Sequence, residues 1–269
     1  MTTADYSVFQ KLVQAYYRQH GRHDLPWRHT TNGFFDPYEI MVSELMLQQT
    51  QVGRVIPKYS SFLTAFPTVS RLAAAPLGAV LTAWSGLGYN RRAKYLQQAA
   101  QAIAGQGTFP ATGAELQRLP GVGVNTAAAI RAYAFDEPVV FIETNIRSVF
   151  IHHFFQDEAA VTDRQILELV QRTLPPSSPR EWYWALMDYG SHLKQTQRHA
   201  ARRSTSYTPQ SAFQGSLRQL RGQVIKRLTE QPLTVGELRA VINDERLSAV
   251  VEVLISEQMI NRRGQQLHI

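Results

Sequence analysis

Apolar residues recur at the spacing of amphipathic helices along most of the chain. Near the N-terminus and again after residue 50 they return every three or four positions, at Phe9, Leu12, Val13, Tyr16 and Tyr17 and at Val55, Tyr59, Phe62, Leu63 and Phe66. Residues 38–49 form a denser apolar run, which predicts a largely buried helix. Further helices are predicted over 77–84 and 91–103, on either side of a Gly-Leu-Gly turn. Strand patterns are scarce, so the sequence predicts an all-α fold.

The amino-acid composition of the chain changes after residue 198. Residues 199–214 are basic and polar, which is typical of a linker. In residues 215–269, three apolar helical stripes precede a short hairpin whose turn carries Arg262 and Arg263. This order predicts a small C-terminal winged-helix-like domain, whose third helix and basic wing would face DNA. A plain helical cap on the core is the alternative interpretation.

The composition excludes several classes of protein. The chain of 269 residues contains no cysteine, which rules out disulfides, thiolate zinc sites and cysteine-ligated iron–sulfur clusters. No window is apolar over the length needed to span a bilayer, and residues 1–7 lack the basic segment of a signal peptide. We therefore expect a cytoplasmic protein that does not contact a membrane.

Positive charge gathers in one part of the chain. The net charge is +7, and residues 191–229 hold eight Lys or Arg and no Asp or Glu, namely Lys194, Arg198, Arg202, Arg203, Arg218, Arg221, Lys226 and Arg227. Such a stripe suits a polyphosphate partner, through Coulomb attraction and counterion release. A solvated linker is the alternative interpretation.

A tight turn between two short helical segments has the features of a hairpin that binds DNA backbone. It consists of Leu119, Pro120, Gly121, Val122 and Gly123. The proline and the two glycines let the backbone turn with its amides exposed. The next helix starts at the same point, so its free N–H groups would point at a phosphate. The sequence therefore predicts a hairpin that holds DNA without reading its bases; a purely structural turn is the alternative.

Two glutamates stand out by their surroundings. Glu44 interrupts the apolar helix predicted over 38–49, where burial would raise its pKa and let it hold a proton near neutral pH. Glu143 follows an apolar run at the start of a predicted helix, where the helix dipole would favour its ionised form. Glycosidic cleavage needs one protonated and one charged carboxyl group. A solvent-facing edge for Glu44 and a simple helix cap for Glu143 are the alternatives.

Six segments occur between Leu25 and Ser191 in a specific order: LPWR (25–28), DPYEIMVSELMLQQTQV (36–52), FPTV (66–69), WSGLGYNRRA (84–93), LPGVGVNTAAAI (119–130) and ALMDYGS (185–191). As a set they resemble the adenine DNA glycosylase family, which belongs with endonuclease III to the helix-hairpin-helix glycosylases. The resemblance implies a two-lobed core over residues 1–198, in which a lobe of residues 28–138 is inserted between 1–27 and 139–198. The lesion would be flipped into the cleft between the lobes.

The resemblance also implies roles for individual residues. Glu44 matches the acid that protonates a ring nitrogen of the flipped adenine. Glu143 stands where the family has an aspartate that stabilises the oxocarbenium-like sugar, and Asn145 matches the asparagine that helps to position it. Gln49 and Tyr89 match residues that wedge into the base stack. The base pocket would be lined by Trp27, Arg28, Leu47 and Trp184, and further DNA contacts would come from Gln48, Asn90, Arg91 and Asn125.

The chain departs from the family pattern at several points. Glu143 is one methylene longer than aspartate, and a displacement near 1 Å can cost on the order of 100-fold in rate. The family's four-cysteine iron–sulfur cluster follows ALMDYGS, where this chain has HLKQTQRHAARR (192–203). Relatives that recognise 8-oxoguanine use a larger C-terminal domain than the one expected here, which leaves that specificity open. Asn90 and Trp184 stand where a second tyrosine and a polar pocket residue are common.

Asn125 bears on the type of glycosylase. Bifunctional relatives place a lysine in this turn, and the lysine forms a Schiff base with the sugar. Asparagine cannot form such a bond. The sequence therefore predicts a monofunctional glycosylase, which leaves an abasic site and does not cut the strand through an amine-linked intermediate.

We therefore expect a glycosylase of base excision repair that acts on double-stranded DNA containing a mismatch or lesion, with adenine as the expected base. It would use no catalytic metal, although the hairpin could hold a monovalent cation through backbone carbonyls. By analogy with the family it would be a nucleoid-associated monomer. A glycosylase for uracil, thymine or another damaged base, and a non-catalytic module that binds damaged DNA, are the alternatives.

Overall fold

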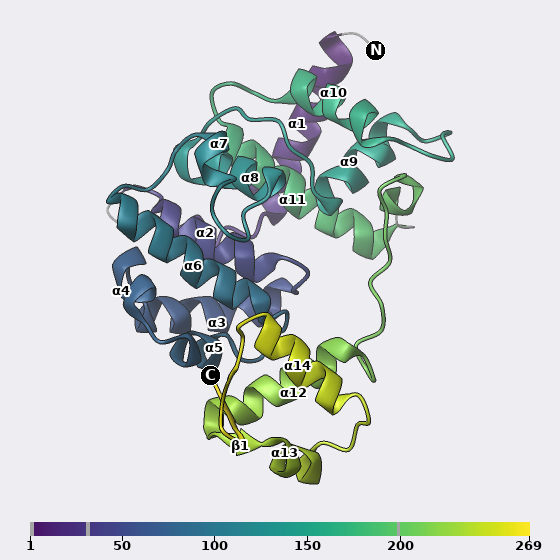
Figure 1. The fold of residues 1–269 in the computed structure, drawn as a ribbon. Coiled ribbons are helices and arrows are strands. Elements are labelled where there is room, and N and C mark those ends of the chain that lie inside the picture. The colour runs from purple at the N-terminus through teal and green to yellow at the C-terminus, as the bar shows by residue number, and fades with distance from the viewer. Residues whose placement is uncertain (1–2, 31–32, 198–199) are drawn as a thin grey trace. The chain divides into compact units, whose positions relative to one another are not determined.

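The structure is a computed structural model that describes residues 3–30, 33–197 and 200–269. Helices dominate it, as the apolar repeat predicts (Figure 1). Contacts divide the chain into two units: the first holds residues 1–41, 111–118 and 122–209, and the second holds residues 42–110, 119–121 and 210–269. Within the described ranges, no helix combines the length and the apolar character that crossing a bilayer requires.

The first unit is built around one long helix, α11 (Pro179–Thr196), which packs against α1 and α9. Aromatic rings fill this core: Phe9 lies 5.8 Å from Trp182 and 5.4 Å from Phe150 between ring centroids. The other elements are α1 (Thr3–His20), η1 (Pro26–Arg28), the start of α2 (Pro37–Leu47), α7 (Gly113–Leu116), α8 (Val124–Phe135), α9 (Thr144–Phe154), α10 (Asp163–Thr173) and η2 (Ala200–Arg203).

The second unit joins the middle helices to the C-terminal residues. Helix α6 packs on α4 and α5, and α5 also packs on α12. Leu72, Trp84 and Leu96 are fully buried in this core. Besides the rest of α2, the middle helices are α3 (Val52–Ala65), α4 (Val69–Ala74), α5 (Leu77–Trp84) and α6 (Arg91–Gln106).

The C-terminal part of the second unit has the predicted winged-helix-like order. Three helices, α12 (Leu217–Glu230), α13 (Val235–Val241) and α14 (Leu247–Ser256), precede a hairpin of β2 (Asn261–Arg263) and β3 (Gln266–His268). The strand β1 (Leu233–Thr234) completes an antiparallel sheet in the order β1-β3-β2, with Leu233 and Arg262 both opposite Leu267. Leu267 is fully buried, so the central strand anchors the wing to the helices.

The predicted linker is shorter than residues 199–214. Val161 donates a backbone hydrogen bond to the Arg203 carbonyl (2.8 Å), and Thr205 donates one to the Val161 carbonyl (2.9 Å). Ala201 and Ser204 are buried. Residues 200–205 are therefore docked on the first unit, because they can satisfy backbone hydrogen bonds there. Arg198, the last residue of the predicted core, and His199, the first residue of the predicted linker, lie outside the described residues.

Candidate active site

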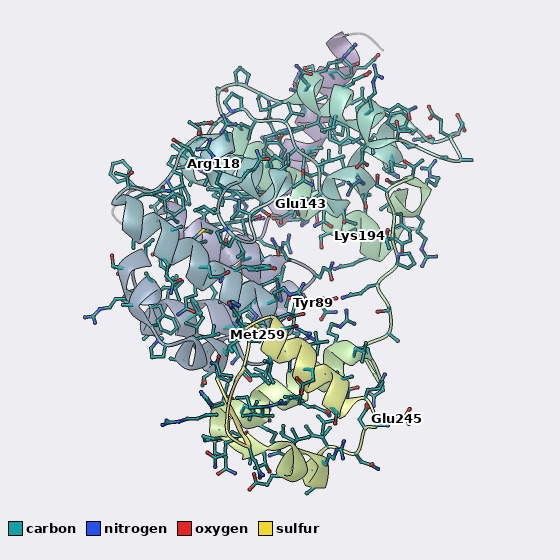
Figure 2. The ribbon with its side chains drawn as sticks, viewed as in Figure 1. Tyr89, Arg118, Glu143, Lys194, Glu245 and Met259 are labelled. Atoms are coloured by element: carbon teal, nitrogen blue, oxygen red, sulfur yellow. The ribbon has the colours of Figure 1, made fainter. Side chains whose placement is uncertain are left out.

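Glu143 lies at the N-cap of α9, on the first unit (Figure 2). Among the described residues, its carboxylate makes no capping hydrogen bond, so the side chain is not used as a simple helix cap. Burial raises the pKa of Glu143, whereas the positive charges of Lys194 and Arg147 lower it. The net effect is a raised pKa of Glu143, so the expectation that its position at the helix start would favour the ionised form is wrong: burial outweighs it, and the two nearby cations offset burial only in part.

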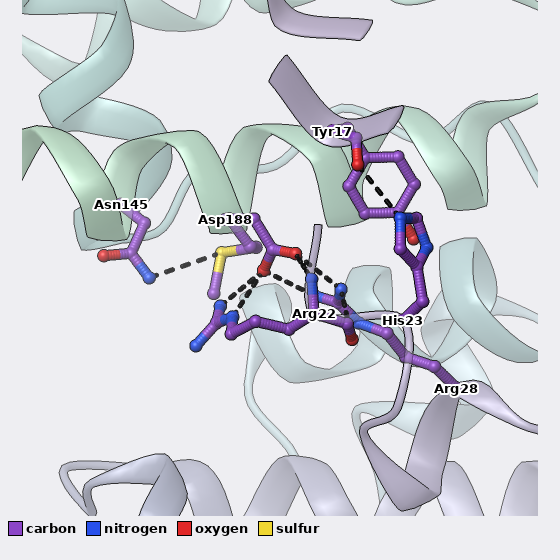
Figure 3. Close-up of polar contacts among 7 residues, drawn as sticks. Tyr17, Arg22, His23, Arg28, Asn145 and Asp188 are labelled. Carbon is purple, nitrogen blue, oxygen red and sulfur yellow. Dashed lines mark hydrogen bonds and ion pairs between the residues drawn. The ribbon is translucent and has the colours of Figure 1, made fainter. Parts of the chain in front are cut away.

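Close packing of two helices fixes the backbone next to Glu143. A Cβ at Gly190 of α11 would lie 2.3 Å from the carbonyl oxygen of Asn145, so only glycine lets α11 approach α9 this closely. The side-chain amide of Asn145 points to the sulfur of Met187, at 3.8 Å (Figure 3). Asn145 is thus held by its backbone two residues from Glu143, where the family resemblance expects the positioning asparagine.

Lys194 was not assigned a site role from sequence. It lies four residues after Gly190, and therefore on the same face of α11, and its side chain is half-buried. Among the described residues the Lys194 ammonium makes no hydrogen bond or ion pair. Burial lowers the pKa of Lys194, and the charge of Glu143 raises it. Lys194 and Glu143 therefore influence each other through charge.

The residues after ALMDYGS do not fit an iron–sulfur cluster. Such a cluster takes cysteine thiolates as ligands, and the chain contains no cysteine. Part of the segment supports α9 instead. The Arg203 guanidinium donates to the carbonyls of Gln156 (2.9 Å) and Glu158 (3.0 Å), as well as to those of Ile151 and Phe155. The structure therefore gives Arg203, which the sequence assigned to DNA binding, a role in holding the end of α9, while Arg202 is exposed.

Arg28 is tied into a buried ion pair (Figure 3). Its two terminal nitrogens donate to the two carboxylate oxygens of Asp188 at 2.8 and 2.9 Å, and Arg22 Nε donates to the same carboxylate at 2.7 Å. Burial disfavours the Asp188 carboxylate, but the hydrogen bonds and charges of Arg28 and Arg22 outweigh it and lower the pKa of Asp188. Sequence analysis did not single out Asp188.

Aromatic side chains surround the Arg28 guanidinium. It lies 5.3 Å from the Trp184 ring and 5.8 Å from the Tyr17 ring. Trp184 stacks on Tyr133 at 6.1 Å and meets Phe35 edge-on at 5.5 Å. Trp184 is half-buried, whereas Trp27 is buried. In the first unit, Arg28 and Trp184, two of the residues predicted for the base pocket, therefore belong to one aromatic and cationic cluster.

Glu44 lies on the part of α2 that belongs to the second unit. Leu45 and Met46 beside it are fully buried, while Glu44 and Leu47 are half-buried. Glu44 is therefore set among apolar side chains and is not on a fully solvent-facing edge. The structure thus supports the predicted surroundings of Glu44, and its catalytic role stays a prediction.

Arg92, which sequence analysis missed, organises two segments of the second unit that carry predicted DNA contacts. Its guanidinium donates to the carbonyls of Leu45 (2.7 Å), Met46 (3.0 Å) and Gln48 (2.5 Å) at the end of α2, and to those of Leu87 (3.3 Å) and Gly88 (3.0 Å) in the glycine turn. It thereby fixes the two segments that present Gln49 and Tyr89. Both residues have positive φ angles, 53° and 48°, which are costly for residues other than glycine.

The predicted turn is present and connects α7 to α8. Leu119 and Val122 are buried, and Gly121 has a φ of 79°. A Cβ at Gly121 would come within 2.8 Å of the Tyr95 Cβ, so this turn requires glycine. Gly123 is the N-cap of α8, and Asn125 is exposed in the first turn. The backbone amides at the start of α8 follow the turn directly, and their binding to phosphate stays a prediction.

Several predicted DNA contacts are engaged in ion pairs of the second unit. Arg91 pairs with Glu257, and Arg262 of the wing pairs with Glu252 at 2.5 Å. Arg263 is exposed, and Gln48 and Asn90 are half-buried. Because exposed ion pairs are weak, the pair of Arg262 with Glu252 can open when a phosphate approaches. The DNA contacts assigned from sequence therefore stay predictions.

The sequence matches the description of one protein family and the sequences of proteins from other organisms. The description "HhH-GPD superfamily base excision DNA repair protein" matches residues 42–176. An adenine DNA glycosylase of Mycolicibacterium smegmatis is 33% identical over 242 residues, which cover 82% of each chain. An adenine DNA glycosylase of Buchnera aphidicola is 35% identical over 190 residues, and the match covers 68% of this chain and 52% of that protein. The chain thus spans about half the length of this second relative.

The fold matches a solved structure as well. A thermostable thymine-DNA glycosylase superimposes with a TM-score of 0.62 at 23% identity, over 73% of this chain and 91% of that one. At this identity the likeness bears on the fold alone. The family match, the sequence identity and the helix-hairpin-helix geometry agree with one another. The chain therefore belongs to the adenine DNA glycosylase family of the helix-hairpin-helix base excision DNA repair superfamily.

Proposed function

We propose that the protein is a monofunctional DNA glycosylase that removes mispaired adenine from double-stranded DNA. The names of its relatives support the adenine substrate. The observation that carries the proposal is the setting of Glu143, a half-buried carboxylate that caps no helix and lies within the electrostatic influence of Lys194 and Arg147. A partly buried carboxylate kept close to positive charge is suited to stabilise a sugar cation when one forms beside it.

The reaction divides between the two glutamates. Glu44 donates a proton to a ring nitrogen of the flipped adenine, and the bond between the base and the sugar C1′ breaks with its electron pair leaving on adenine. Glu143 stabilises the resulting oxocarbenium ion. Water adds its oxygen to C1′, and the proton it releases restores the protonated state of Glu44 through solvent. The products are free adenine and an abasic site.

Other side chains prepare this chemistry. Lys194 and Arg147 favour the ionised form of Glu143 against the effect of burial. Asn145 positions the sugar, Gln49 and Tyr89 occupy the space that the flipped base leaves in the stack, and the hairpin holds the backbone. Asn125 offers no amine for a Schiff base. The protein works as a nucleoid-associated monomer without an iron–sulfur cluster, and its hairpin takes a monovalent cation.

A panel of duplexes tests the substrate. Single-turnover base release is measured on adenine opposite guanine, 8-oxoguanine and cytosine, on uracil and thymine opposite guanine, and on hypoxanthine, with alkali to cleave at abasic sites. We expect release of adenine from mispairs only, and no covalent complex after borohydride treatment. Release of another base alone would refute the adenine substrate. Binding without any release would refute the enzyme and favour a damage-binding module.

A further inference from the structure

The cations of α12 fall into two groups by their partners. Arg221 and Arg227 each pair with a glutamate. Lys226 is exposed, and its ammonium makes no hydrogen bond or ion pair with any residue that the structure describes. The Arg218 guanidinium donates only to neutral oxygens of those residues. The charges of Arg218 and Lys226 are therefore not compensated by an acidic partner in the described parts of the chain.

Arg218 and Lys226 lie on one face of α12, with Gly222 between them. Their spacing of four residues places the three positions one above another along the helix. A Cβ at Gly222 would meet no atom of the described residues within 4 Å beyond the backbone of its own helix. Glycine destabilises a helix interior relative to alanine, and no packing contact requires it here. The face of α12 is therefore open between its two uncompensated cations.

A cavity of about 650 Å³ follows this face. Its lining includes Arg218, Gly222 and Lys226 of α12, and Arg54 of α3. Arg54 is exposed and donates to the Gly86 carbonyl, which leaves it further N–H donors. Among the described residues that line the cavity there is no aspartate or glutamate. Three cations without an anion suit a partner that carries a row of phosphates.

The third helix of the C-terminal part lacks such charge, although the winged-helix order predicts that it faces DNA. Residues 247–256, which form α14, contain no Lys or Arg, and they carry the exposed Glu252. This glutamate pairs with Arg262 of the wing. Because a helix that approaches DNA needs cations to offset the phosphates, α12 fits this role and α14 does not.

Ion pairs hold α12 beside the predicted DNA contacts of the second unit. Glu257 pairs with Arg91 of α6 and with Arg221 of α12. Arg218 donates to the hydroxyl of Tyr89, and its guanidinium lies 4.8 Å from that ring. The open face of α12 therefore starts next to the residue that is expected to enter the base stack.

We propose that Arg54, Arg218 and Lys226 form a track for the phosphate backbone of duplex DNA, so that α12, and not α14, is the helix of the C-terminal part that faces DNA. This inference rests on the proposed function, which makes duplex DNA the partner. Gly222 leaves room for the backbone between the two cations of α12. Such contacts position a protein on DNA and do not read its sequence.

The test measures affinity for a fully paired, undamaged duplex at several salt concentrations, so that no base has to be released. Each phosphate contact contributes about 0.9 to the slope of log affinity against log salt, so Lys226→Gln and Arg54→Gln should each lower its magnitude by about 1. Lys226→Arg keeps the charge and should keep the slope. Arg239→Gln is the matched control, at an exposed arginine of α13 outside the cavity, and it should leave the slope unchanged.

Gly222→Leu tests the open face without a change of charge. Leucine is a better helix former than glycine, so the midpoint of urea unfolding should not fall. The affinity for the duplex should fall at least as much as in Lys226→Gln, because the side chain occupies the path of the backbone. Gly105→Leu is the control, at an exposed glycine of α6 whose surroundings are equally open and which does not line the cavity. It should leave the affinity unchanged.

The outcomes separate this inference from the proposed function. Unchanged slopes in Lys226→Gln and Arg54→Gln would overturn the track, even if adenine is released. A lower slope in Arg263→Gln without one in Lys226→Gln would show that the wing faces DNA and that the proposal is wrong. If the slopes fall as expected but no adenine is released, the track stands and only the proposed activity is refuted.

Discussion

Arg28 in the first unit and Arg92 in the second are each 8% exposed, yet their guanidinium groups have different partners. Arg28 faces the Asp188 carboxylate, which is 3% exposed, and the pair is neutral. Arg92 donates to five backbone carbonyls and the Thr50 hydroxyl, and all of these are neutral groups. Burial lowers the pKa of Arg92 to about 10, so it stays charged near neutral pH.

The difference shows two uses of a buried cation. The neutral pair joins residues 22–28 to α11 and stabilises the first unit. The cation of Arg92 instead holds two loops in a conformation with positive φ at Gln49 and Tyr89, and leaves positive charge beneath the surface that is proposed to receive DNA. Ring contacts support both, with Trp184 beside Arg28 and Trp84 beside Arg92, each at 5.3 Å.

The largest effect is expected when the neutral pair is broken. Asp188→Ala removes the counter-charge of Arg28 and leaves a buried guanidinium, so the free energy of unfolding should fall by about 3–5 kcal/mol in urea denaturation. Asp163→Ala is the control, because Asp163 makes a similar two-point contact with Arg147 in a more exposed place. It should cost no more than about 1 kcal/mol. Equal losses would contradict the role given to burial.

Loss of the Arg92 cation should lower the free energy of unfolding less than Asp188→Ala does, and it should lower the rate of adenine release more. Arg92→Met keeps much of the volume but leaves the carbonyls at the end of α2 without their donor, for a loss of about 2–3 kcal/mol. The rate of adenine release should fall by more than the smaller fraction of folded protein explains, because Gln49 and Tyr89 lose the side chain that supports both of them. Arg71→Met, at an exposed arginine of α4, is the control. Unchanged release by a folded Arg92→Met would show that this support is dispensable.

The two arginines should also differ in their response to acid. The pKa of Asp188 is lowered in the folded protein, so its pair stabilises fully above the ordinary pKa of about 4. This contribution is lost as the pH falls through the lower folded pKa. Among the residues that the structure describes, no acidic side chain pairs with Arg92, so Arg92 adds no such loss. The free energy of unfolding, followed from about pH 5 to about pH 3, should therefore fall less steeply in Asp188→Asn than in wild type. Parallel curves would contradict the lowered pKa.

The features that could be predicted from sequence are those set by neighbours in the chain. The apolar repeat predicts the helices, the glycines predict the hairpin at 119–123, and the order of stripes predicts the winged-helix-like part. These signals are local, because helix periodicity and turn chemistry need only a few consecutive residues. The surroundings of Glu44 were predictable for the same reason, since they follow from its place in an apolar helix.

Contacts between distant residues could not be predicted. Asp188 lies 160 residues from Arg28, and Arg218 lies 129 residues from Tyr89, so no spacing rule connects them. The setting of Glu143 depends on how closely α11 approaches α9, which the single Gly190 permits. The contacts of Arg203 with backbone carbonyls of the first unit could not be predicted, because a basic run has the same sequence whether it binds a phosphate or a backbone carbonyl.

In the proposed reaction, a carboxyl group on α2 starts base release. The decisive measurement is the single-turnover release of adenine from a duplex with one adenine–guanine mispair, compared between wild type and Glu44→Gln. Glutamine keeps the shape and cannot donate the proton, so the rate should fall by about 10²–10⁴-fold while the affinity for the duplex is retained. Release by Glu44→Gln at the wild-type rate would show that Glu44 does not supply the proton.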